Sequence, residues 1–253
     1  MTRLFGTDGI RGRANVPPMD CDTALKTGRA VGLMARNMGQ NRVVIGKDTR
    51  ISGDMLEAAM AAGVASAGMA AGLIGVIPTP GVAYLSTCLE GVGAGVMISA
   101  SHNPFYDNGI KVFQKGGLKL TDVQEQALEA DIYNPEIVPR KDVGKISIIS
   151  DGLEKYARFL QGRFPFRKLS SRIKLVVDAA NGAASEICHQ VFTDQLFDAV
   201  FIHDAPDGFN INQDCGSQHT SDLQKQVKAW KADLGIAFDG DADRMIAVDE
   251  IGE

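Results

Sequence analysis

The sequence has few of the features that mark disulfide-stabilised, membrane-spanning or nucleic-acid-binding proteins. Only 4 of its 253 residues are cysteines, and these are widely spaced without a Cys-x-x-Cys pair. We therefore expect free thiols rather than a disulfide framework or a zinc site. No apolar run approaches the about 20 residues of a membrane-spanning helix, and the first residues lack the pattern of a signal peptide. These absences predict a cytoplasmic protein without a membrane partner.

Positive charge is also scarce. Lys and Arg together number 26 against 31 Asp and Glu, and the resulting net charge of -5 argues against a nucleic-acid partner. The hydrophobic content of 45% is typical of a globular protein. The length allows one large domain or two ordinary ones with a sizeable core.

A serine-containing loop follows one of the predicted strands. Residues 94–98 form an apolar run typical of a buried strand, and the sequence Ser-Ala-Ser-His-Asn-Pro follows at 99–104. Open α/β sheets present their ligands at the carboxyl ends of strands. Ser101 is thus a candidate functional residue, with His102 and Asn103 beside it. A plain turn is the alternative, because Ser, Asn and Pro all favour turns.

A second loop carries three acidic residues at alternate positions. Residues 234–238 predict a strand, and the sequence Asp-Gly-Asp-Ala-Asp-Arg follows at 239–244. Carboxylates this close repel one another unless a cation lies among them. Carboxylate oxygens are ligands for magnesium, calcium or manganese, and magnesium usually keeps open positions for water or phosphate oxygen. The loop therefore predicts a divalent metal site.

Two other interpretations of the acidic loop fit less well. A calcium-binding EF-hand needs a glycine at its sixth position, where this sequence has Arg244, and both flanks, 234–238 and 245–248, predict strands instead of helices. A haloacid-dehalogenase-like phosphatase would use an aspartate after a strand as nucleophile. That interpretation leaves the third aspartate and the serine loop without a role.

The chain divides into two halves of similar organisation. Residues 134–145 are polar and contain Pro135 and Pro139, so we place a domain boundary near Gly144, with a first domain at 1–144 and a second at 145–253. Segments 7–12 and 107–109 are expected to be a loop and a turn. Further strands are expected at 42–46, 73–77, 110–113, 173–177 and 199–202. Helices are expected at 22–38, 52–71, 82–89, 121–130, 151–162, from about 183 to 196 and at 222–230, with Asp22 or Thr23 capping the first and Thr121 the fourth. The alternation predicts two related α/β units.

Three motifs together resemble the α-D-phosphohexomutase superfamily. They are Phe-Gly-Thr-Asp-Gly-Ile-Arg-Gly at 5–12, the serine loop and the acidic loop. Supporting segments lie at 46–50, 78–80, 107–111 and 206–212, so the resemblance covers nearly the whole chain in the family's order. Within the superfamily, the bacterial phosphoglucosamine mutases are the most similar group. The resemblance implies two consecutive three-layer α/β/α domains with mixed, mostly parallel sheets.

The resemblance also implies a function and a set of cofactors. Phosphoglucosamine mutases interconvert glucosamine 6-phosphate and glucosamine 1-phosphate through a phosphoserine and a bisphosphorylated sugar intermediate, in amino-sugar metabolism and cell-wall precursor synthesis. One Mg²⁺ per chain and a bisphosphorylated sugar as activator are expected. A phosphosugar is the expected partner, with a homodimer as one option. A phosphomannomutase or phosphoglucomutase differs only in the sugar.

Site residues are carried over from the matching motifs. The phosphoserine is expected at Ser101, with Ser99 as the competing nucleophile. The metal is expected on Ser101 and on three aspartates, Asp239, Asp241 and Asp243. Phosphate binding is expected from Arg244 and Asn103, although a salt bridge to a neighbouring aspartate is an alternative for Arg244. Proton transfer, or orientation of a sugar hydroxyl, is expected from Arg11 and Lys111. His102 is a third acid–base candidate and could instead only hold its loop.

The sequence departs from the family in length. Family members are substantially longer and have four domains, whereas this sequence stops at Glu253, shortly after the acidic loop. We expect the domains that recognise the sugar hydroxyls and grip the distal phosphate to be missing. Two hypotheses follow: a catalytic half with little or no activity alone, or a non-catalytic fragment that binds metal and phosphate or only dimerises.

Overall fold

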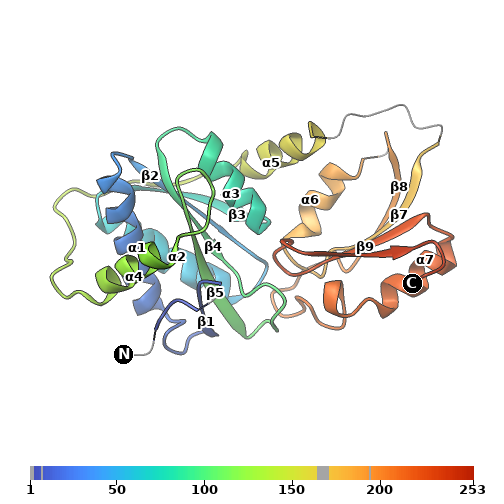
Figure 1. Ribbon diagram of the computed structural model, residues 1–253, viewed down its shortest axis with the longest axis horizontal. Coiled ribbons are helices and arrows are strands. Elements are labelled where there is room, and N and C mark those ends of the chain that lie inside the picture. The colour runs from blue at the N-terminus through green and yellow to red at the C-terminus, as the bar shows by residue number, and fades with distance from the viewer. Residues whose placement is uncertain (1–2, 7, 164–170, 194) are drawn as a thin grey trace. The chain divides into compact units, whose positions relative to one another are not determined.

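The computed structural model describes residues 3–6, 8–163, 171–193 and 195–253, and it divides into two compact units (Figure 1). Within the described residues, the first unit takes Met1–Lys47, Ser52–Ala100 and Tyr106–Ser150. The second unit takes Asp48–Ile51, Ser101–Phe105 and Asp151–Glu253. Two short segments from the first half of the sequence therefore belong to the second unit, and one of them carries Ser101 and the rest of the serine loop.

The first unit is built on a mixed sheet with the strand order β1-β5-β4-β2-β3-β6. Its strands are β1 (Ile10–Arg13), β2 (Arg42–Lys47), β3 (Ala70–Val76), β4 (Val92–Ile98), β5 (Asp107–Gln114) and β6 (Ile146–Ile148). Its helices are α1 (Cys21–Asn37), α2 (Ser52–Ser66), α3 (Thr79–Cys88) and α4 (Asp122–Tyr133). β2, β3, β4 and β6 pair in parallel, whereas β5 runs antiparallel to both β4 and β1.

Helices cover both faces of this sheet. Neighbouring residues of β2 show the two faces: Ile45 belongs to the core formed with α1 and α2, and a side chain on Gly46 would collide with Val82 of α3. Successive strand residues point to opposite faces, so α1 and α2 pack on one side and α3 on the other. Leu128 and Ile132 of α4 join the core on the α1 side.

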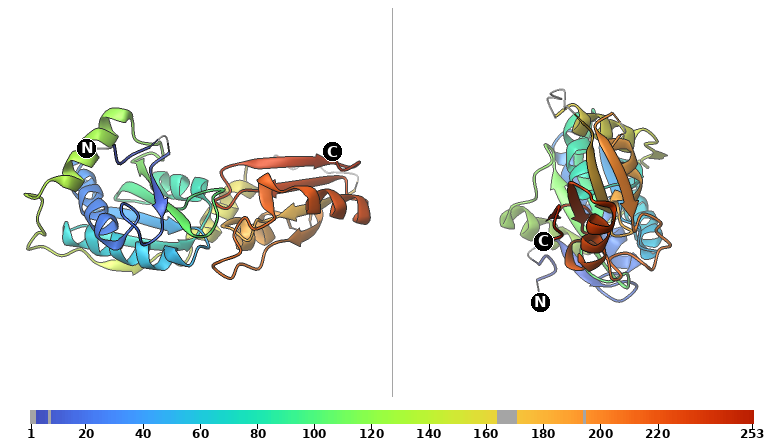
Figure 2. Two further views of the ribbon diagram at one scale, coloured as in Figure 1. Left: turned by 90° about the horizontal axis from the view of Figure 1, so that it is seen from below. Right: turned by 90° about the vertical axis from the view of Figure 1, so that its right-hand side faces the viewer.

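The second unit has a smaller sheet with the order β10-β9-β7-β8. Its strands are β7 (Ile173–Asp178), β8 (Phe197–Ile202), β9 (Leu234–Phe238) and β10 (Met245–Asp249), and its helices are α5 (Gly152–Gln161), α6 (Ala184–Val191), the 3₁₀ turn η1 (Gly216–Gln218) and α7 (Ser221–Trp230). β7 is parallel to β8 and β9, and β10 is antiparallel to β9. Val177 packs with α6 and Val176 with α7, so this sheet also lies between two helical layers (Figure 2). The fold class expected from the sequence is confirmed for both units.

Several element boundaries differ from those expected. The sequence predicts a loop at 7–12. Thr7 of this segment lies outside the residues that the structure describes. Instead, β1 pairs with the edge of β5, with Ile10 opposite Ile110. The close approach explains Gly9, whose φ is 87° and where a Cβ would lie 2.3 Å from the Ile110 carbonyl oxygen. The 107–109 turn is likewise part of β5, which begins at Asp107.

Helix ends were also misplaced. α2 stops at Ser66 rather than near 71, because Gly68 is left-handed and Ala70 and Ala71 pair with β2. Sheet pairing here outweighs the helical preference of alanine. α6 ends at Val191 instead of 196, shortly before β8. α1 is capped by Asp20, whose carboxylate accepts from Thr23 N at 2.9 Å, instead of by Asp22 or Thr23.

The cap of α4 is as expected. Thr121 forms a capping box with Gln124, which satisfies two backbone N–H groups that the first turn of the helix leaves without partners. Among the described residues, no helix has the length and apolar character that crossing a membrane requires.

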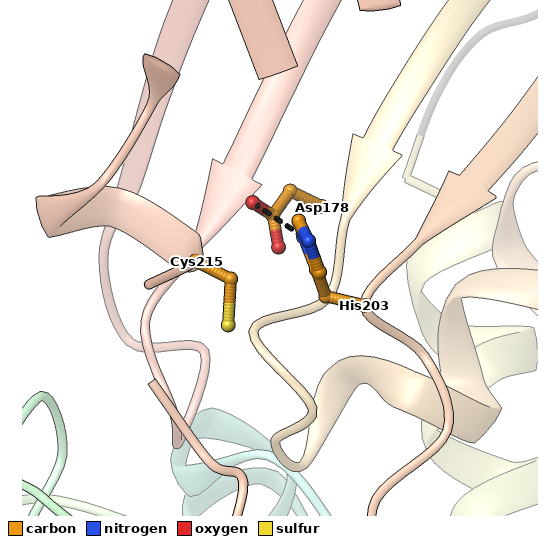
Figure 3. Close-up of side chains that lie close together, drawn as sticks. All are labelled: Asp178, His203 and Cys215. Atoms are coloured by element: carbon orange, nitrogen blue, oxygen red, sulfur yellow. Dashed lines mark ion pairs between the residues drawn. The ribbon is translucent and has the colours of Figure 1, made fainter. Parts of the chain in front are cut away.

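A buried aspartate at the end of β7 organises three loops of the second unit. Asp178 accepts hydrogen bonds from Ala180 N at 2.9 Å and from Gly216 N at 2.8 Å, and its carboxylate lies 3.2 Å from His203 Nδ1 (Figure 3). The adjacent carboxylate of Asp178 raises the pKa of His203 against the opposing effect of burial, and Asp222 and Asp204 raise it further. Protonated His203 therefore stabilises the folded state.

Substitution of His203 by Asn should remove a pH-dependent part of the stability. The folded-state pKa is raised above the unfolded value of about 6.5, so this contribution is complete below about pH 6.5 and is lost as the pH rises through the folded-state pKa. We expect the substitution to lower the free energy of unfolding by about 1 kcal/mol at pH 6 and by less at pH 9. Urea unfolding at a series of pH values measures this difference.

His219→Asn is the control, because His219 is exposed and should show no such difference. A destabilisation by His203→Asn that stays constant from pH 6 to pH 9 would contradict the assignment.

Candidate functional site

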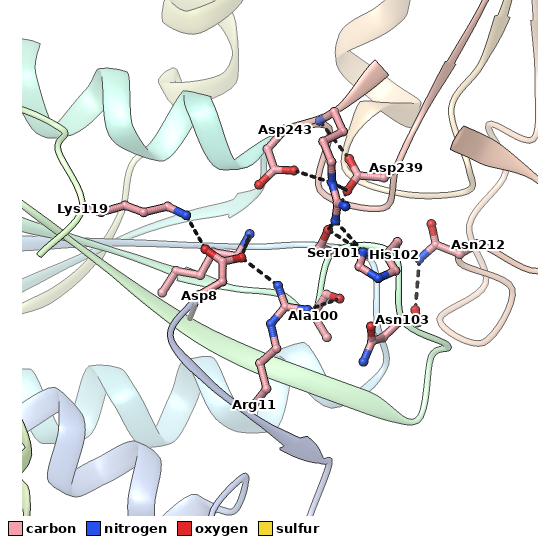
Figure 4. A network of polar contacts seen from close by, with 12 residues as sticks. Asp8, Arg11, Ala100, Ser101, His102, Asn103, Lys119, Asn212, Asp239 and Asp243 are labelled. Atoms are coloured by element: carbon pink, nitrogen blue, oxygen red, sulfur yellow. Dashed lines mark hydrogen bonds and ion pairs between the residues drawn. The ribbon is translucent and has the colours of Figure 1, made fainter. Parts of the chain in front are cut away.

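Ser101 is buried in the second unit and held in an uncommon backbone conformation. Its exposed fraction is 0% and its φ is 54°, a left-handed value that few residues other than glycine adopt. Its hydroxyl donates a hydrogen bond to Asp239 Oδ2 at 2.6 Å and accepts one from Arg244 Nη2. The serine that follows β4 thus contacts the loop that follows β9, as Figure 4 shows for Ser101 and Asp239.

The acidic loop brings its three carboxylates together. Asp239 and Asp241 are fully buried, Asp243 is exposed, and each offers an oxygen within 4.8 Å of the others. Gly240 is required between them, because a Cβ at this position would lie 2.6 Å from the Ser101 carbonyl oxygen. Ala242 is left-handed with a φ of 53°, and its N–H closes the turn on the Asp239 carbonyl at 2.9 Å.

The electrostatics of this loop favour a bound cation. Burial raises the pKa of Asp239 above its ordinary value, and the neighbouring carboxylates of Asp241 and Asp243 raise it further. Both effects reflect negative charge that the surroundings compensate incompletely. A divalent cation among the three carboxylates would offset the repulsion, and a set of carboxylate oxygens is what magnesium or calcium prefers. The residues present therefore fit a hard metal ion.

Arg244 forms the salt bridges considered from the sequence, and phosphate binding by this residue stays a prediction. Its Nε lies 3.2 Å from Asp239 Oδ2 and 3.4 Å from Asp243 Oδ1, while Nη2 bonds to Ser101 Oγ and to His102 Nδ1. The side chain is 53% exposed, so it forms salt bridges and still presents N–H groups around the serine hydroxyl. His102 Nδ1 also lies 3.4 Å from that hydroxyl, which agrees with either of the roles considered for it.

Three residues of the second unit lie at the serine loop or support a residue that contacts it, and none of them was predicted as a site residue. Two of them, Arg50 and Asn212, donate to backbone carbonyls of the loop, and the third, Asp48, is the ion-pair partner of Arg50. One available signal was that residues 48–50 follow β2, which is parallel to β4, so both segments leave the same edge of one sheet. Asn103 contributes its carbonyl oxygen to these contacts, and phosphate binding by this residue stays a prediction.

The first unit holds a separate group of charged side chains. Asp8 accepts from Arg11 Nη2 at 2.7 Å, forms an ion pair with Lys111 Nζ at 3.1 Å and contacts Lys119 Nζ. Burial acts to raise the pKa of Asp8, but the ammonium groups of Lys119 and Lys111 outweigh it and hold this pKa below its ordinary value. Arg11 Nη1 also donates to the Ala100 carbonyl at 3.3 Å; Figure 4 shows Asp8, Arg11 and Ala100.

The catalytic roles of Arg11 and Lys111 stay predictions, because both residues belong to the first unit and the serine loop to the second. Ser99, the competing nucleophile, also belongs to the first unit. Its backbone N–H donates to the Gly109 carbonyl at 2.9 Å.

A second set of potential metal ligands occurs among the described residues, at Asp178, His203 and Cys215. Burial, with nearby Asp178, raises the pKa of the Cys215 thiol to about 12, which disfavours the thiolate that a metal would need. Both carboxylate oxygens of Asp178 already accept backbone N–H groups. We assign this cluster to loop structure.

Family models match most of the chain. The model described as phosphoglucomutase/phosphomannomutase, alpha/beta/alpha domain I, matches residues 2–137, and the corresponding domain II matches residues 154–252. The family models leave residues 138–153 unmatched, and the domain boundary near Gly144 stays a prediction.

Individual relatives agree with the family models. The chain is 52% identical to a phosphoglucosamine mutase of Desulforapulum autotrophicum, covering 100% of this chain and 58% of the relative. It is 48% identical to a phosphoglucosamine mutase of Syntrophobacter fumaroxidans, covering 100% of this chain and 57% of the relative. The chain therefore spans little more than half the length of these proteins.

A solved structure is similar over nearly the whole chain. It is that of a phosphoglucomutase/phosphomannomutase family protein from Burkholderia thailandensis, with a TM-score of 0.86 and 29% identity, covering 99% of this chain and 55% of that one. The resemblance seen in the sequence motifs is confirmed. The chain belongs to the phosphoglucomutase/phosphomannomutase family.

Proposed function

We propose that this chain provides the phosphoserine and metal sites of a phosphoglucosamine mutase, an isomerase that interconverts glucosamine 6-phosphate and glucosamine 1-phosphate. The observation that carries the proposal is the 2.6 Å hydrogen bond from Ser101 Oγ to Asp239 in a loop of three clustered carboxylates. The names of the relatives, at 52% and 48% identity, support glucosamine phosphate as substrate. A phosphomannomutase or phosphoglucomutase is the alternative within the family.

In this proposal Ser101 Oγ carries the phosphoryl group that is exchanged with the sugar. Asp239, Asp241 and Asp243 would hold Mg²⁺, which supplies positive charge near the phosphoryl oxygens when bound. Asp239 orients the serine hydroxyl through its hydrogen bond. Arg244 already donates to that hydroxyl, and its planar guanidinium suits the oxygens of a phosphoryl group at the same place. These side chains provide the positioning and charge stabilisation on which phosphoryl transfer mainly depends.

Arg11 and Lys111 are proposed to orient the sugar oxygens. Both cations are ion-paired with Asp8, an arrangement that fixes charged hydrogen-bond donors in place. An arginine is also a poor proton donor, so we favour orientation over proton transfer for Arg11. His102 remains the acid–base candidate beside the serine.

The proposed ligands agree in class with those of a protein of the same fold. A structure of Aspergillus fumigatus N-acetylphosphoglucosamine mutase, 17% identical with a TM-score of 0.54, was solved in complex with GlcNAc-6P and magnesium. Its likeness concerns the fold, and the amino-sugar phosphate named there is of the class proposed here. A bisphosphorylated sugar as activator, a cytoplasmic location and a homodimer are proposed from the sequence resemblance.

Incubation with glucose 1,6-bisphosphate and Mg²⁺ should place one phosphoryl group on Ser101, because its hydroxyl lies against the proposed metal ligands. Intact-mass measurement followed by peptide mapping locates the modification. Ser101→Ala should abolish uptake, whereas the matched control Ser99→Ala should keep it. Uptake on Ser99, or none on the unchanged chain, would contradict the proposed phosphoserine.

Asp241→Asn should weaken Mg²⁺ binding by at least about tenfold, which corresponds to about 1.4 kcal/mol, because it removes a charged ligand while keeping the side-chain volume. Isothermal titration calorimetry measures the affinity, and circular dichroism checks that the fold is retained. Asp198→Asn makes the same charge change at an exposed position of β8 and should leave the affinity unchanged. Equal affinity in the Asp241 and Asp198 variants would place the metal elsewhere.

A further inference from the structure

We propose that Arg50 is a positioning residue for phosphoryl transfer, which acts on the serine by fixing the backbone of its loop. The inference rests on the proposed function, because the loop that Arg50 holds is the one that carries the proposed phosphoserine. Arg50 lies in Asp48–Ile51, the short segment that belongs to the second unit together with Ser101–Phe105.

The charge of Arg50 is buried with a matched partner. The side chains of Arg50 and Asp48 are both 0% exposed, and Arg50 Nε donates to Asp48 Oδ2 at 2.9 Å. The backbone N–H of Arg50 donates to the other oxygen, Asp48 Oδ1, at 3.0 Å. A buried ion pair rarely adds net stability, because removing two charges from water is costly. Its burial beneath a functional loop therefore suggests a role in geometry.

The rest of the guanidinium is directed at carbonyl oxygens of the serine loop. Nη2 donates to Ser101 O at 3.0 Å and to Asn103 O at 2.8 Å, and Nη1 donates to Pro104 O. Three carbonyls of a four-residue segment thus converge on one planar group. Arginine has five N–H donors in a rigid fork, whereas lysine has three on a flexible stem, so lysine cannot reproduce this set.

A second donor acts on the same carbonyls from another side. Asn212 Nδ2 donates to Ser101 O at 2.9 Å and to Asn103 O at 3.1 Å. Asn212 is itself anchored, since its N–H donates to Ala180 O at 2.9 Å. The Ser101 carbonyl therefore receives hydrogen bonds from both Arg50 and Asn212, and Gly240 packs directly against it.

These contacts explain how Ser101 keeps its left-handed backbone. A non-glycine residue at such a φ is strained by roughly 1–3 kcal/mol and persists only where the surroundings impose it. Fixing the Ser101 carbonyl fixes the adjoining peptide plane, which sets the direction of the Cα–Cβ bond and so of Oγ toward Asp239. A displacement of about 1 Å at a reacting group can cost about 100-fold in rate.

The segment that carries Arg50 is firmly attached to the second unit. Thr49 Oγ1 donates to Asn181 O at 2.6 Å, and Ile51 N donates to Gly208 O at 3.0 Å. The serine loop has its own apolar contact with the same region, because the rings of Phe105 and Phe209 meet edge to face with centroids 5.4 Å apart. Arg50 thus holds the loop from a fixed position.

The test compares Arg50→Lys, which keeps the charge but loses the fork, with Asn212→Ala, which leaves the buried ion pair intact. For each variant we would measure the rate of Ser101 phosphorylation by glucose 1,6-bisphosphate, the Mg²⁺ affinity and the amide hydrogen exchange of the serine loop. Arg29→Lys is the matched control, because Arg29 is a part-buried arginine that donates to Ser66 and Ile137 in the first unit.

We expect both variants to slow phosphorylation by about 10- to 100-fold, with Mg²⁺ affinity within about threefold of the unchanged chain and with faster exchange confined to the serine loop. A purely structural role would lower stability and metal affinity together and would leave the rate per folded molecule unchanged. Phosphorylation at the unchanged rate in Arg50→Lys and Asn212→Ala would overturn the positioning role while leaving the proposed function intact.

Failure of the proposed function gives a different result. If the unchanged chain takes up no phosphoryl group, the proposed function is overturned. The role of Arg50 in phosphoryl transfer is then overturned with it. Amide hydrogen exchange of the serine loop then decides whether Arg50 holds the loop. If the loop exchanges as slowly in Arg50→Lys as in the unchanged chain, the structural part of the proposal is overturned as well.

Discussion

The hydrogen bond between Ser101 and Asp239 is the interaction on which the second unit's functional loops depend. It joins residues 138 positions apart at 2.6 Å, with both residues fully buried. Several constraints accompany this contact. Ser101 has a left-handed backbone, and position 240 has no room for a side chain. Burial and the repulsion between neighbouring carboxylates raise the pKa of Asp239. Features this costly persist where the surroundings impose them, and they gather at functional sites.

The division of the chain into units follows from the same constraint. Segments 48–51 and 101–105 leave the ends of parallel strands in the first unit, yet their contacts are with the second. Ordering two loops costs conformational entropy, and hydrogen bonds to Asn181, Gly208 and Asn212 offset it. Both segments remain covalently part of the first half, so the folding of the second unit requires residues from three separate stretches of sequence.

The sequence predicted most strands, the fold class and the two loops, because periodicity and turn chemistry are local signals. It did not predict β1, whose pairing depends on the edge of β5, or the strand conformation of Ala70 and Ala71, which sheet pairing imposes against their helical preference. Motif matching pointed to Ser101 and the aspartates. Arg50 and Asn212 were not predicted as site residues because their partners are backbone carbonyls. No pattern of residue types shows which carbonyl a side chain contacts.

Holding a loop by its carbonyls has a chemical advantage when the serine itself must change. Ser101 Oγ would alternate between a hydroxyl and a phosphate ester, so contacts made to Oγ must break and reform in each cycle. Arg50 and Asn212 donate only to the backbone in the contacts described, and those bonds can persist in both states. Arg244, which does contact Oγ, is half exposed and has room to adjust. Buried Arg50 thus preserves the loop geometry, whereas half-exposed Arg244 can change its contacts when the charge on Ser101 Oγ changes.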